Sequence, residues 1–324
     1  MAATVFIDGE SGTTGLQIRQ RLQDRGDIAV VSIDAARRKD SAARAEIIND
    51  ADAVILCLPD DAAREAVGLV KNNRTRIIDA STAHRTADGW TYGFPEMDAG
   101  QHAKVAESGR VSNPGCYATG AIALLRPLVS RALLPAGWPV TINAVSGYSG
   151  GGKALISAFE DKNSPNFTHD NFRLYAMGVV QKHIEEIQVF SGLSGRPLFI
   201  PSVGRFAQGM LVSVPLQLWA VPGRPTLETL HAALVEQYAR ERFVSVVPLE
   251  QTLAIGHAPS VDARNPEPES LNNTNHMQLS VFGNPEHEQA VLLAKLDNLG
   301  KGASGQAVQN LNLMLGLSEA TGLT

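Results

Sequence analysis

The first part of the chain carries the stretch Thr4-Val5-Phe6-Ile7-Asp8-Gly9-Glu10-Ser11-Gly12-Thr13-Thr14-Gly15, which is followed by an amphipathic segment over residues 16–22. An apolar strand, a glycine-rich turn and a helix in this order form the context of a dinucleotide-binding unit. Glycines let the backbone turn sharply and approach a pyrophosphate, whose charge then rests on N–H groups at the helix start. The spacing G-x-x-G-x-x-G differs from the usual G-x-G-x-x-G, so the glycines alone would also fit an ordinary tight turn.

Three further strands are predicted after this unit, over residues 28–34, 53–58 and 76–80, with helical segments between them. Strands that alternate with helices predict an α/β fold with a parallel, doubly wound sheet of the Rossmann type. Cys57 lies inside the third apolar run, where a thiol is expected to be an inert part of the core.

The end of the second strand bears on the choice of nicotinamide cofactor. Asp34 stands where an acidic residue would bind the ribose hydroxyls of NAD, and Arg37, Arg38 and Lys39 follow within one turn. These basic residues could instead hold the 2′-phosphate of NADP, or form a solvated loop. We expect NADP, with NADPH as the reductant, and the acceptance of NAD as a second cofactor stays open.

Cys116 is the strongest candidate for chemistry in the chain. The turn sequence Ser112-Asn113-Pro114-Gly115 precedes it, and an apolar run typical of a helix follows. Backbone N–H groups and the helix macrodipole favour a thiolate at such a position, which turns the sulfur into a useful nucleophile. The alternative is a small buried thiol with no chemical role.

A cysteine enzyme needs a proton carrier near the sulfur, and the carrier is most often a histidine. His183 lies at the start of a predicted helix with acidic neighbours that could orient it, whereas His84 follows a strand of the first domain and is the second candidate. The histidines and cysteines show no zinc spacing, and no H-E-x-x-H or G-x-S-x-G motif occurs. We therefore expect neither a metal site nor a serine hydrolase.

The second half of the chain predicts an α+β domain. A strand over residues 140–145 leads into a loop with Ser146, Tyr148, Ser149 and Gly150, whose hydroxyl and amide groups suit a phosphate or a carboxylate; a flexible linker is the alternative. Further strands are predicted over residues 211–218, 243–249 and 277–282, and helices over residues 175–189 and 226–240. We expect the sheet of this domain to form a subunit interface as well.

The last predicted helix begins near Gln306 and has one apolar side that needs a partner surface. We expect this helix to return to the first domain. The predicted domains are therefore residues 1–117 with 300–324, which bind NADP, and residues 118–299, which bind the substrate and dimerise.

Composition excludes several other classes. The 324 residues are 44% hydrophobic and 19% charged with a formal net charge of −5, which gives no basic footprint for a nucleic acid. Two cysteines cannot form a disulfide framework, and no apolar stretch approaches about 20 residues. We expect no signal peptide, because a strand-like segment begins at Thr4. We expect a cytoplasmic protein without a membrane partner.

Several motifs, in the same order along nearly the whole chain, resemble the N-acetyl-γ-glutamyl-phosphate reductases of arginine biosynthesis, in their shorter subtype and within the aspartate-semialdehyde-dehydrogenase-like superfamily. These motifs are residues 9–15, 79–85, 93–96, 112–119, 146–150, 182–187 and 297–305. The longer subtype has His-x-His-x-Pro-Glu-Ile where this chain has Lys182-His183-Ile184-Glu185-Glu186-Ile187. This departure concerns the candidate base, His183, and does not affect the expectation for Cys116.

The resemblance implies an enzyme that reduces N-acetyl-L-glutamyl 5-phosphate to N-acetyl-L-glutamate 5-semialdehyde and phosphate with NADPH. Cys116 would form a thioester, His183 would act as acid and base, and the subunits would assemble as a homodimer or homotetramer. The predicted cofactor-binding residues are Gly9, Ser11, Gly12, Thr13, Thr14, Gly15, Arg37, Arg38, Ser81 and Asn298. The predicted substrate-binding residues are Asn113, Ser146, Tyr148, Ser149, Gly150 and Arg205. Arg205 is the candidate for binding the substrate carboxylate, and an ordinary surface ion pair is the alternative.

Two other functions stay open at this point. An aspartate-semialdehyde dehydrogenase shares the same plan and chemistry with a shorter substrate, although the Pro-Gly-Cys-Tyr run around Cys116 fits it less well. A nucleotide-binding sensor would have the fold without the catalysis.

Overall fold

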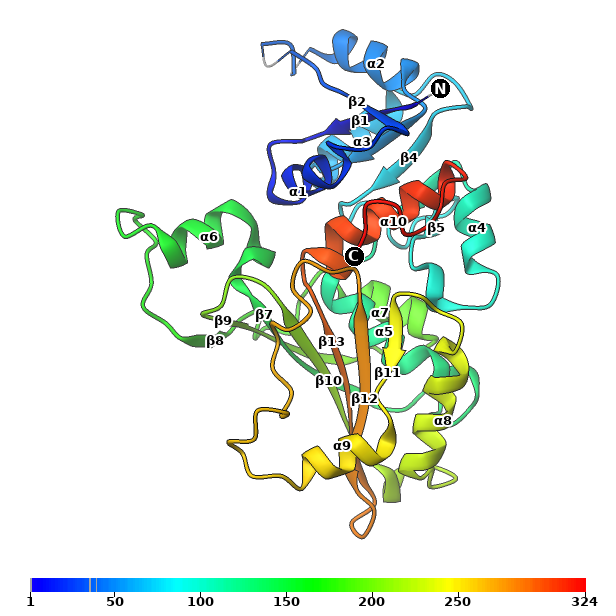
Figure 1. Ribbon diagram of the computed structural model, residues 1–324, viewed down its shortest axis with the longest axis vertical. Helices are drawn as coiled ribbons and strands as arrows, with labels where there is room; N and C mark the ends of the chain where they lie inside the picture. Colours follow the sequence, from blue (N-terminus) through cyan, green and yellow to red (C-terminus); the bar gives the residue numbers. More distant parts are fainter. Residues whose placement is uncertain (1, 35, 39) are drawn as a thin grey trace. The chain divides into compact units, whose positions relative to one another are not determined.

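The computed structural model describes residues 2–34, 36–38 and 40–324 (Figure 1). The chain divides into two compact units. The first contains the residues up to Gly115 together with Ala303–Thr324, and the second contains Cys116–Gly302.

The first unit is an α/β structure around a parallel sheet, as the sequence predicted. Its strands are β1 (Ala3–Asp8), β2 (Ile28–Val31), β3 (Ala53–Leu56), β4 (Arg76–Asp79), β5 (Thr91–Tyr92) and β6 (Arg110–Ser112). Its helices are α1 (Thr13–Leu22), α2 (Ser41–Asp50), α3 (Asp60–Gly68), η1 (Pro95–Met97), α4 (Gln101–Glu107) and α10 (Gly305–Met314). The strand order is β2-β1-β3-β4-β6-β5, and the paired neighbours run parallel.

Side chains that alternate along β1 serve the two faces of this sheet. Val5 and Ile7 join the cluster that contains Ile18 of α1 and Leu311 of α10. Phe6 belongs to the cluster on α2 and α3. Because strand side chains point to opposite faces in turn, both faces are buried, which explains the continuous apolar runs in the sequence.

The second unit is built on a mixed sheet. Its strands are β7 (Thr141–Gly147), β8 (Phe172–Leu174), β9 (Leu198–Gly204), β10 (Met210–Gln217), β11 (Val244–Val246), β12 (Met277–Asn284) and β13 (Gln289–Leu296). Its helices and helical turns are α5 (Cys116–Ser130), η2 (Tyr148–Gly151), α6 (Gly152–Glu160), α7 (Ile184–Ser191), η3 (Leu218–Ala220), α8 (Leu227–Tyr238) and α9 (Leu249–Gly256), with η4 (Gly300–Ser304) at the junction. The strand order is β11-β12-β13-β10-β7-β9-β8.

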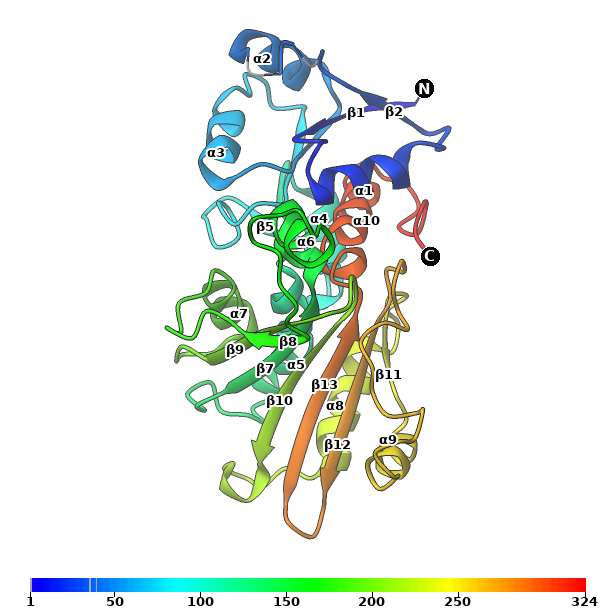
Figure 2. The same cartoon turned by 90° about the vertical axis from the view of Figure 1, so that its left-hand side faces the viewer.

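Helix α5 is the central support of the second unit. It packs on β10 and β13 and against α7 and α8, and Figure 2 shows α5 and α8 on the same side of the sheet. Ile122, Leu125 and Leu128 have no exposed surface. The first residue of this helix is therefore held by a well-packed body.

Three predicted elements are wrong in extent, and one of them is the strand predicted over residues 28–34, which ends at Val31. Residues 175–183 are not helical, because Ala176 and Val179 have positive φ angles of 52° and 56°, which a right-handed helix does not allow; the helix begins at Ile184. The strand predicted over residues 243–249 ends at Val246, because Pro248 is the N-cap of α9.

Candidate active site

Cys116 is the first residue of α5 and is partly exposed. The sequence predicted this position at a helix N-terminus, and the structure confirms it. The first N–H groups of a helix have no partner within the helix, so they can stabilise negative charge on the sulfur or on a bound oxygen. The position suits a nucleophile that forms an acyl intermediate.

His183 immediately precedes α7 and is held at several points. Its Nδ1 lies 2.7 Å from Oε1 of Glu186, and its main-chain N–H donates to Oε1 of Gln181 at 2.7 Å. Both His183 and Glu186 are nearly fully buried, with 4% and 1% of their surface exposed. A carboxylate on Nδ1 fixes the proton of the neutral ring there, which assigns proton exchange to Nε2.

Tyr117 links the cysteine and the histidine. It follows Cys116 in α5, and its ring meets the His183 ring edge-on at 5.6 Å between centroids. Its hydroxyl donates to the carbonyl oxygen of Ser202 at 3.0 Å and accepts from the hydroxyl of Tyr175 at 3.1 Å. Burial raises the pKa of Tyr117 and Tyr175, and negative charge on Cys116 raises both further, so the two phenols stay protonated beside the sulfur.

Tyr117, Tyr175 and Glu186 were not among the predicted site residues. The position of Tyr117 next to Cys116 and the i,i+3 spacing of Glu186 from His183 are signals that the sequence contained. No local pattern marked Tyr175, because it lies in the segment that was predicted to be helical.

The loop after β7 places its predicted substrate-binding residues in the same unit as Cys116. Ser149 is buried, and its hydroxyl accepts from Nδ2 of Asn298 at 3.0 Å. The Tyr148 hydroxyl donates to Oε1 of Glu160 at 2.9 Å, and its ring stacks on Phe159 at 4.9 Å. The loop is thus an ordered structure rather than a flexible linker.

Arg205 holds the segment after α6. Its guanidinium donates to the carbonyl oxygens of Asp170 at 3.0 Å, Phe159 at 3.3 Å and Thr168, and it lies over the Phe159 ring at 5.0 Å. Three of its five N–H donors are used in this way. Its predicted contact with a substrate carboxylate stays a prediction.

Gly9 shapes the loop that is predicted to bind the cofactor. Its φ angle is +89°, and a Cβ there would lie 2.4 Å from the carbonyl oxygen of Cys57, so only glycine fits. The loop from Gly9 to Gly12 leads into α1 between the carboxyl ends of β1 and β3, where the strand order reverses. Open α/β sheets bind ligands at this point, and the first N–H groups of α1 suit a pyrophosphate.

The residues after β2 bear on the choice of cofactor. Oδ1 of Asp34 accepts from the main-chain N–H of Ala36 at 2.8 Å, so this carboxylate caps its own turn. Arg37 and Arg38 are exposed, and Nε of Arg37 lies 3.6 Å from Asp40. Lys39, the third basic residue, lies outside the described residues.

His84, the second candidate base, lies in the first unit and has a carboxylate partner of its own. Its Nδ1 is 2.6 Å from Oδ2 of Asp79, and its ring stacks on Trp90 at 4.2 Å. The Ser81 hydroxyl donates to the same Asp79 oxygen at 2.8 Å.

Asn113 also lies in the first unit, and its buried side chain supports the fold there. Its Oδ1 accepts from Nδ2 of Asn310 at 3.0 Å, and its Nδ2 donates to the carbonyl oxygen of Ala303 at 3.0 Å. Its predicted contact with the substrate stays a prediction.

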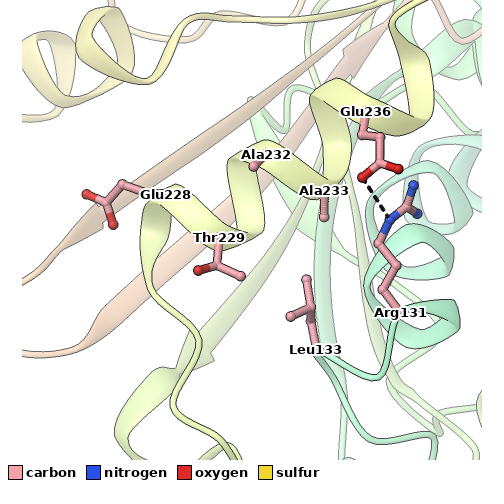
Figure 3. A pocket seen from close by; sticks show the side chains of 7 residues that line it. All are labelled: Arg131, Leu133, Glu228, Thr229, Ala232, Ala233 and Glu236. Atoms are coloured by element: carbon pink, nitrogen blue, oxygen red, sulfur yellow. Dashed lines mark ion pairs between the residues drawn. The ribbon is translucent and has the colours of Figure 1, made fainter.

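A hollow of about 470 Å³ on the second unit is lined by Arg131, Leu133, Glu228, Thr229, Ala232, Ala233 and Glu236 (Figure 3). Arg131 follows the last residue of α5, and a helix of 15 residues is about 20 Å long. The hollow therefore lies at the end of α5 remote from Cys116, and it is not the site of the chemistry.

Within residues 2–34, 36–38 and 40–324, no group of three or more His, Cys, Asp or Glu side chains could hold a metal ion. No helix in that part of the chain has the length and apolar character that crossing a membrane requires.

Comparison with known proteins agrees with both units. Residues 4–105 match the family model "Semialdehyde dehydrogenase, NAD binding domain", and residues 116–298 match "Semialdehyde dehydrogenase, dimerisation domain". A solved aspartate semialdehyde dehydrogenase from Francisella tularensis aligns with a TM-score of 0.70 at 12% identity, over 97% of this chain and 100% of that one. A second such enzyme from Vibrio cholerae, complexed with ASA, aligns at 0.68 with 14% identity, over 97% of this chain and 98% of that one. At such low identity these structures show a shared fold.

The fold and the two matched models thus define a protein of the semialdehyde-dehydrogenase type, with a domain for a nicotinamide cofactor. Two curated relatives are much closer in sequence. The "N-acetyl-gamma-glutamyl-phosphate reductase 2" of Nostoc sp. is 52% identical over 322 residues, with 98% of each chain covered. The "N-acetyl-gamma-glutamyl-phosphate reductase" of Brucella ovis is 54% identical over 317 residues, with 98% of this chain and 100% of the relative covered. The chain belongs to the N-acetyl-γ-glutamyl-phosphate reductase family, as the resemblance of its motifs implied.

Proposed function

We propose that the protein reduces N-acetyl-L-glutamyl 5-phosphate to N-acetyl-L-glutamate 5-semialdehyde, with release of phosphate, in arginine biosynthesis. The relatives at 52% and 54% identity support the substrate. The observation that carries the chemistry is Cys116 at the N-terminus of α5, joined through Tyr117 to the His183–Glu186 pair.

In the proposed mechanism the Cys116 thiolate attacks the acyl carbon, the bond from that carbon to the phosphate oxygen breaks, and phosphate leaves. A thioester remains on the sulfur. The bound nicotinamide cofactor supplies the hydride that reduces this thioester. Amide groups at the start of α5 hold the negative charge that develops on the carbonyl oxygen. His183, oriented by Glu186, exchanges the proton as the thiohemiacetal collapses to the aldehyde and the thiolate.

The cofactor is proposed to be NADP. The glycine loop would hold the pyrophosphate, and Ser81 and Asn298 would make further contacts with the cofactor. The exposed Arg37 and Arg38 would hold the 2′-phosphate, and the use of Asp34 as a turn cap supports this choice. The two proposed domains are residues 1–117 with 300–324 and residues 118–299. The proposed location of the protein is the cytoplasm.

The proposed assembly is a homodimer or a tetramer made of dimers. One face of the sheet in the second unit is covered by α5 and α8, and strand residues on the opposite face alternate with the buried ones. On that face Val291 is 39% exposed, and Leu293 is partly buried. Light scattering of Leu293→Asp against the wild type tests this surface, and an unchanged mass would count against it.

The function is tested by NADP reduction with N-acetylglutamate semialdehyde and phosphate, with aspartate semialdehyde and NAD as parallel controls. We expect phosphate-dependent turnover that is confined to the acetylated substrate and prefers NADP. Turnover with aspartate semialdehyde alone would contradict the proposed substrate, and cofactor binding without any turnover would favour a sensor.

A further inference from the structure

The turn formed by residues 297–302, here named the Asp297 turn, follows β13 and reaches the start of α5. A Cβ on Gly302 would lie 2.7 Å from Cβ of Cys116 and 3.3 Å from its Cα. Side-chain carbons do not approach each other that closely. The backbone of Gly302 is therefore in direct contact with the nucleophilic residue, and a side chain at this position would displace it.

Asp297 holds the turn in shape. It has no exposed surface, and its Oδ2 accepts from Nε2 of Gln208 at 2.5 Å and from the main-chain N–H of Asn273 at 2.7 Å. Its Oδ1 accepts from the N–H of Leu299 at 2.9 Å, and its carbonyl oxygen accepts from the N–H of Gly302 at 2.9 Å. Bonds from neutral donors to a buried carboxylate are strong, so the turn is rigid where it meets Cys116.

The same turn is joined to the loop after β7. The Asn298 side chain donates to Ser149 Oγ at 3.0 Å and accepts from the N–H of Gly209 at 2.7 Å. Lys301, the neighbour of Gly302, has no exposed surface, and its Nζ lies 5.7 Å from the centre of the Phe243 ring. The turn is thus anchored on both sides of its contact with Cys116.

We propose that the Asp297 turn is a positioning device for the nucleophile. Contact with the bare Cα of Gly302 fixes the Cβ of Cys116, and through it the position of the sulfur relative to the acyl carbon. The inference rests on the proposed role of Cys116 and adds Gly302 and Asp297 as positioning residues. Displacement of a reacting atom by about 1 Å can lower a rate by about 10²-fold.

Gly302→Ala tests this device. We expect kcat to fall by about 10- to 100-fold while NADPH affinity changes by less than about 2-fold. The alkylation rate of Cys116 with iodoacetamide, measured across pH, is the decisive readout because it needs neither substrate nor cofactor. We expect this rate or its pH midpoint to shift. Inactivity of the wild type toward the proposed substrate would overturn the proposed function and leave this test intact.

Gly283→Ala is the matched control. A Cβ there would lie 2.4 Å from the carbonyl oxygen of Gln289, so the steric clash is as severe as the one at Gly302. Gly283 is six residues along β12 from Met277, which pairs with Leu296 beside the turn, and this separation is about 20 Å. We expect lower thermal stability with wild-type alkylation of Cys116.

If Gly302→Ala does not fold, Gln208→Met tests the positioning role of the Asp297 turn instead. It removes one hydrogen bond from Asp297 without inserting a group against Cys116, and we expect a loss in kcat of about 2- to 10-fold with the same direction of change in alkylation. A folded Gly302→Ala protein with the alkylation profile and kcat of the wild type would overturn the proposal. The same result for Gln208→Met, where it is the only folded variant, would overturn it as well.

Discussion

The carboxyl edge of the sheet in the first unit and the start of α5 in the second unit contain the same residue types in similar pairs. The first region has Cys57 and the His84–Asp79 pair, whose Nδ1 and carboxylate oxygen are 2.6 Å apart. The second has Cys116 and the His183–Glu186 pair, with a separation of 2.7 Å. A cysteine and an oriented histidine in one unit therefore do not by themselves define a catalytic site.

The surroundings separate the two regions. Cys57 is partly exposed like Cys116, but desolvation raises the pKa of its thiol to about 12, and the carboxylates of Asp79 and Asp8 add to this shift. The His84 ring lies flat against Trp90, with 14° between the planes. Cys116 instead begins a helix, and Tyr117 beside it meets the edge of the His183 ring. We therefore expect the local field at the sulfur, rather than the residue type, to distinguish the proposed nucleophile.

The largest expected difference is the reactivity of the two thiols. With a pKa of about 12, Cys57 is thiolate in only about one molecule in 10⁴ at pH 8, because a thiol is mostly neutral at a pH below its pKa. We expect iodoacetamide at pH 8 to modify Cys116 at least about 10³-fold faster than Cys57. Peptide mass spectrometry measures both rates. Comparable alkylation rates for Cys116 and Cys57 would contradict the expected difference between the two thiols.

The two histidines give the next difference. We expect His183→Asn to lower kcat by about 10²- to 10⁴-fold, because proton transfer loses its carrier. His84→Asn should change kcat by less than about 3-fold and act mainly on the thermal unfolding midpoint, since its partners are Asp79 and Trp90. The reverse pattern of kcat values would assign the base to the first unit.

Glu186→Gln separates orientation from proton transfer. The amide keeps the size of the carboxylate but no longer stabilises the charged ring, and it can favour the other tautomer. We expect kcat to fall by about 10- to 100-fold, with little change in the KM for the substrate. The pH profile of kcat should move as well, and an unchanged profile at normal kcat would limit Glu186 to a structural role.

The smallest expected effect concerns the cofactor. We expect Arg37→Ala and Arg38→Ala each to raise the KM for NADPH by about 10-fold, the value of one charge-assisted hydrogen bond, and to leave the KM for NADH unchanged. Steady-state kinetics with both cofactors measure this selectivity. An equal loss with the two cofactors would place the arginines away from the 2′-phosphate.

The sequence predicted those features that depend on neighbouring residues. The turn from Gly9 to Gly15, the position of Cys116 at a helix start and the position of His183 just before a helix are all set by local backbone chemistry. The alternation of β1 between two apolar clusters also follows from residues next to each other.

Several features that were missed depend on residues far apart in the chain. β9 was not predicted, and it pairs in parallel with β7, 57 positions earlier. β13 was missed as well and is an exception, because its hairpin partner β12 is close in the sequence. Contact between Gly302 and Cys116 joins positions 186 residues apart, and no periodicity reveals it. Positive φ angles at Ala176 and Val179 overrode the helical pattern, because tertiary contacts decide such conformations.

The central claim is that Cys116 carries an acyl group, and intact-protein mass spectrometry tests it most directly. The enzyme is mixed with N-acetylglutamate semialdehyde and NADP in the absence of phosphate. Under these conditions no phosphate can take the acyl group from the thioester. We predict a mass increase of one N-acetylglutamyl group on the wild-type chain, located to Cys116 by peptide mapping and absent from Cys116→Ser. Formation of NADPH with no adduct on the wild type, or an adduct that persists in Cys116→Ser, would contradict the account.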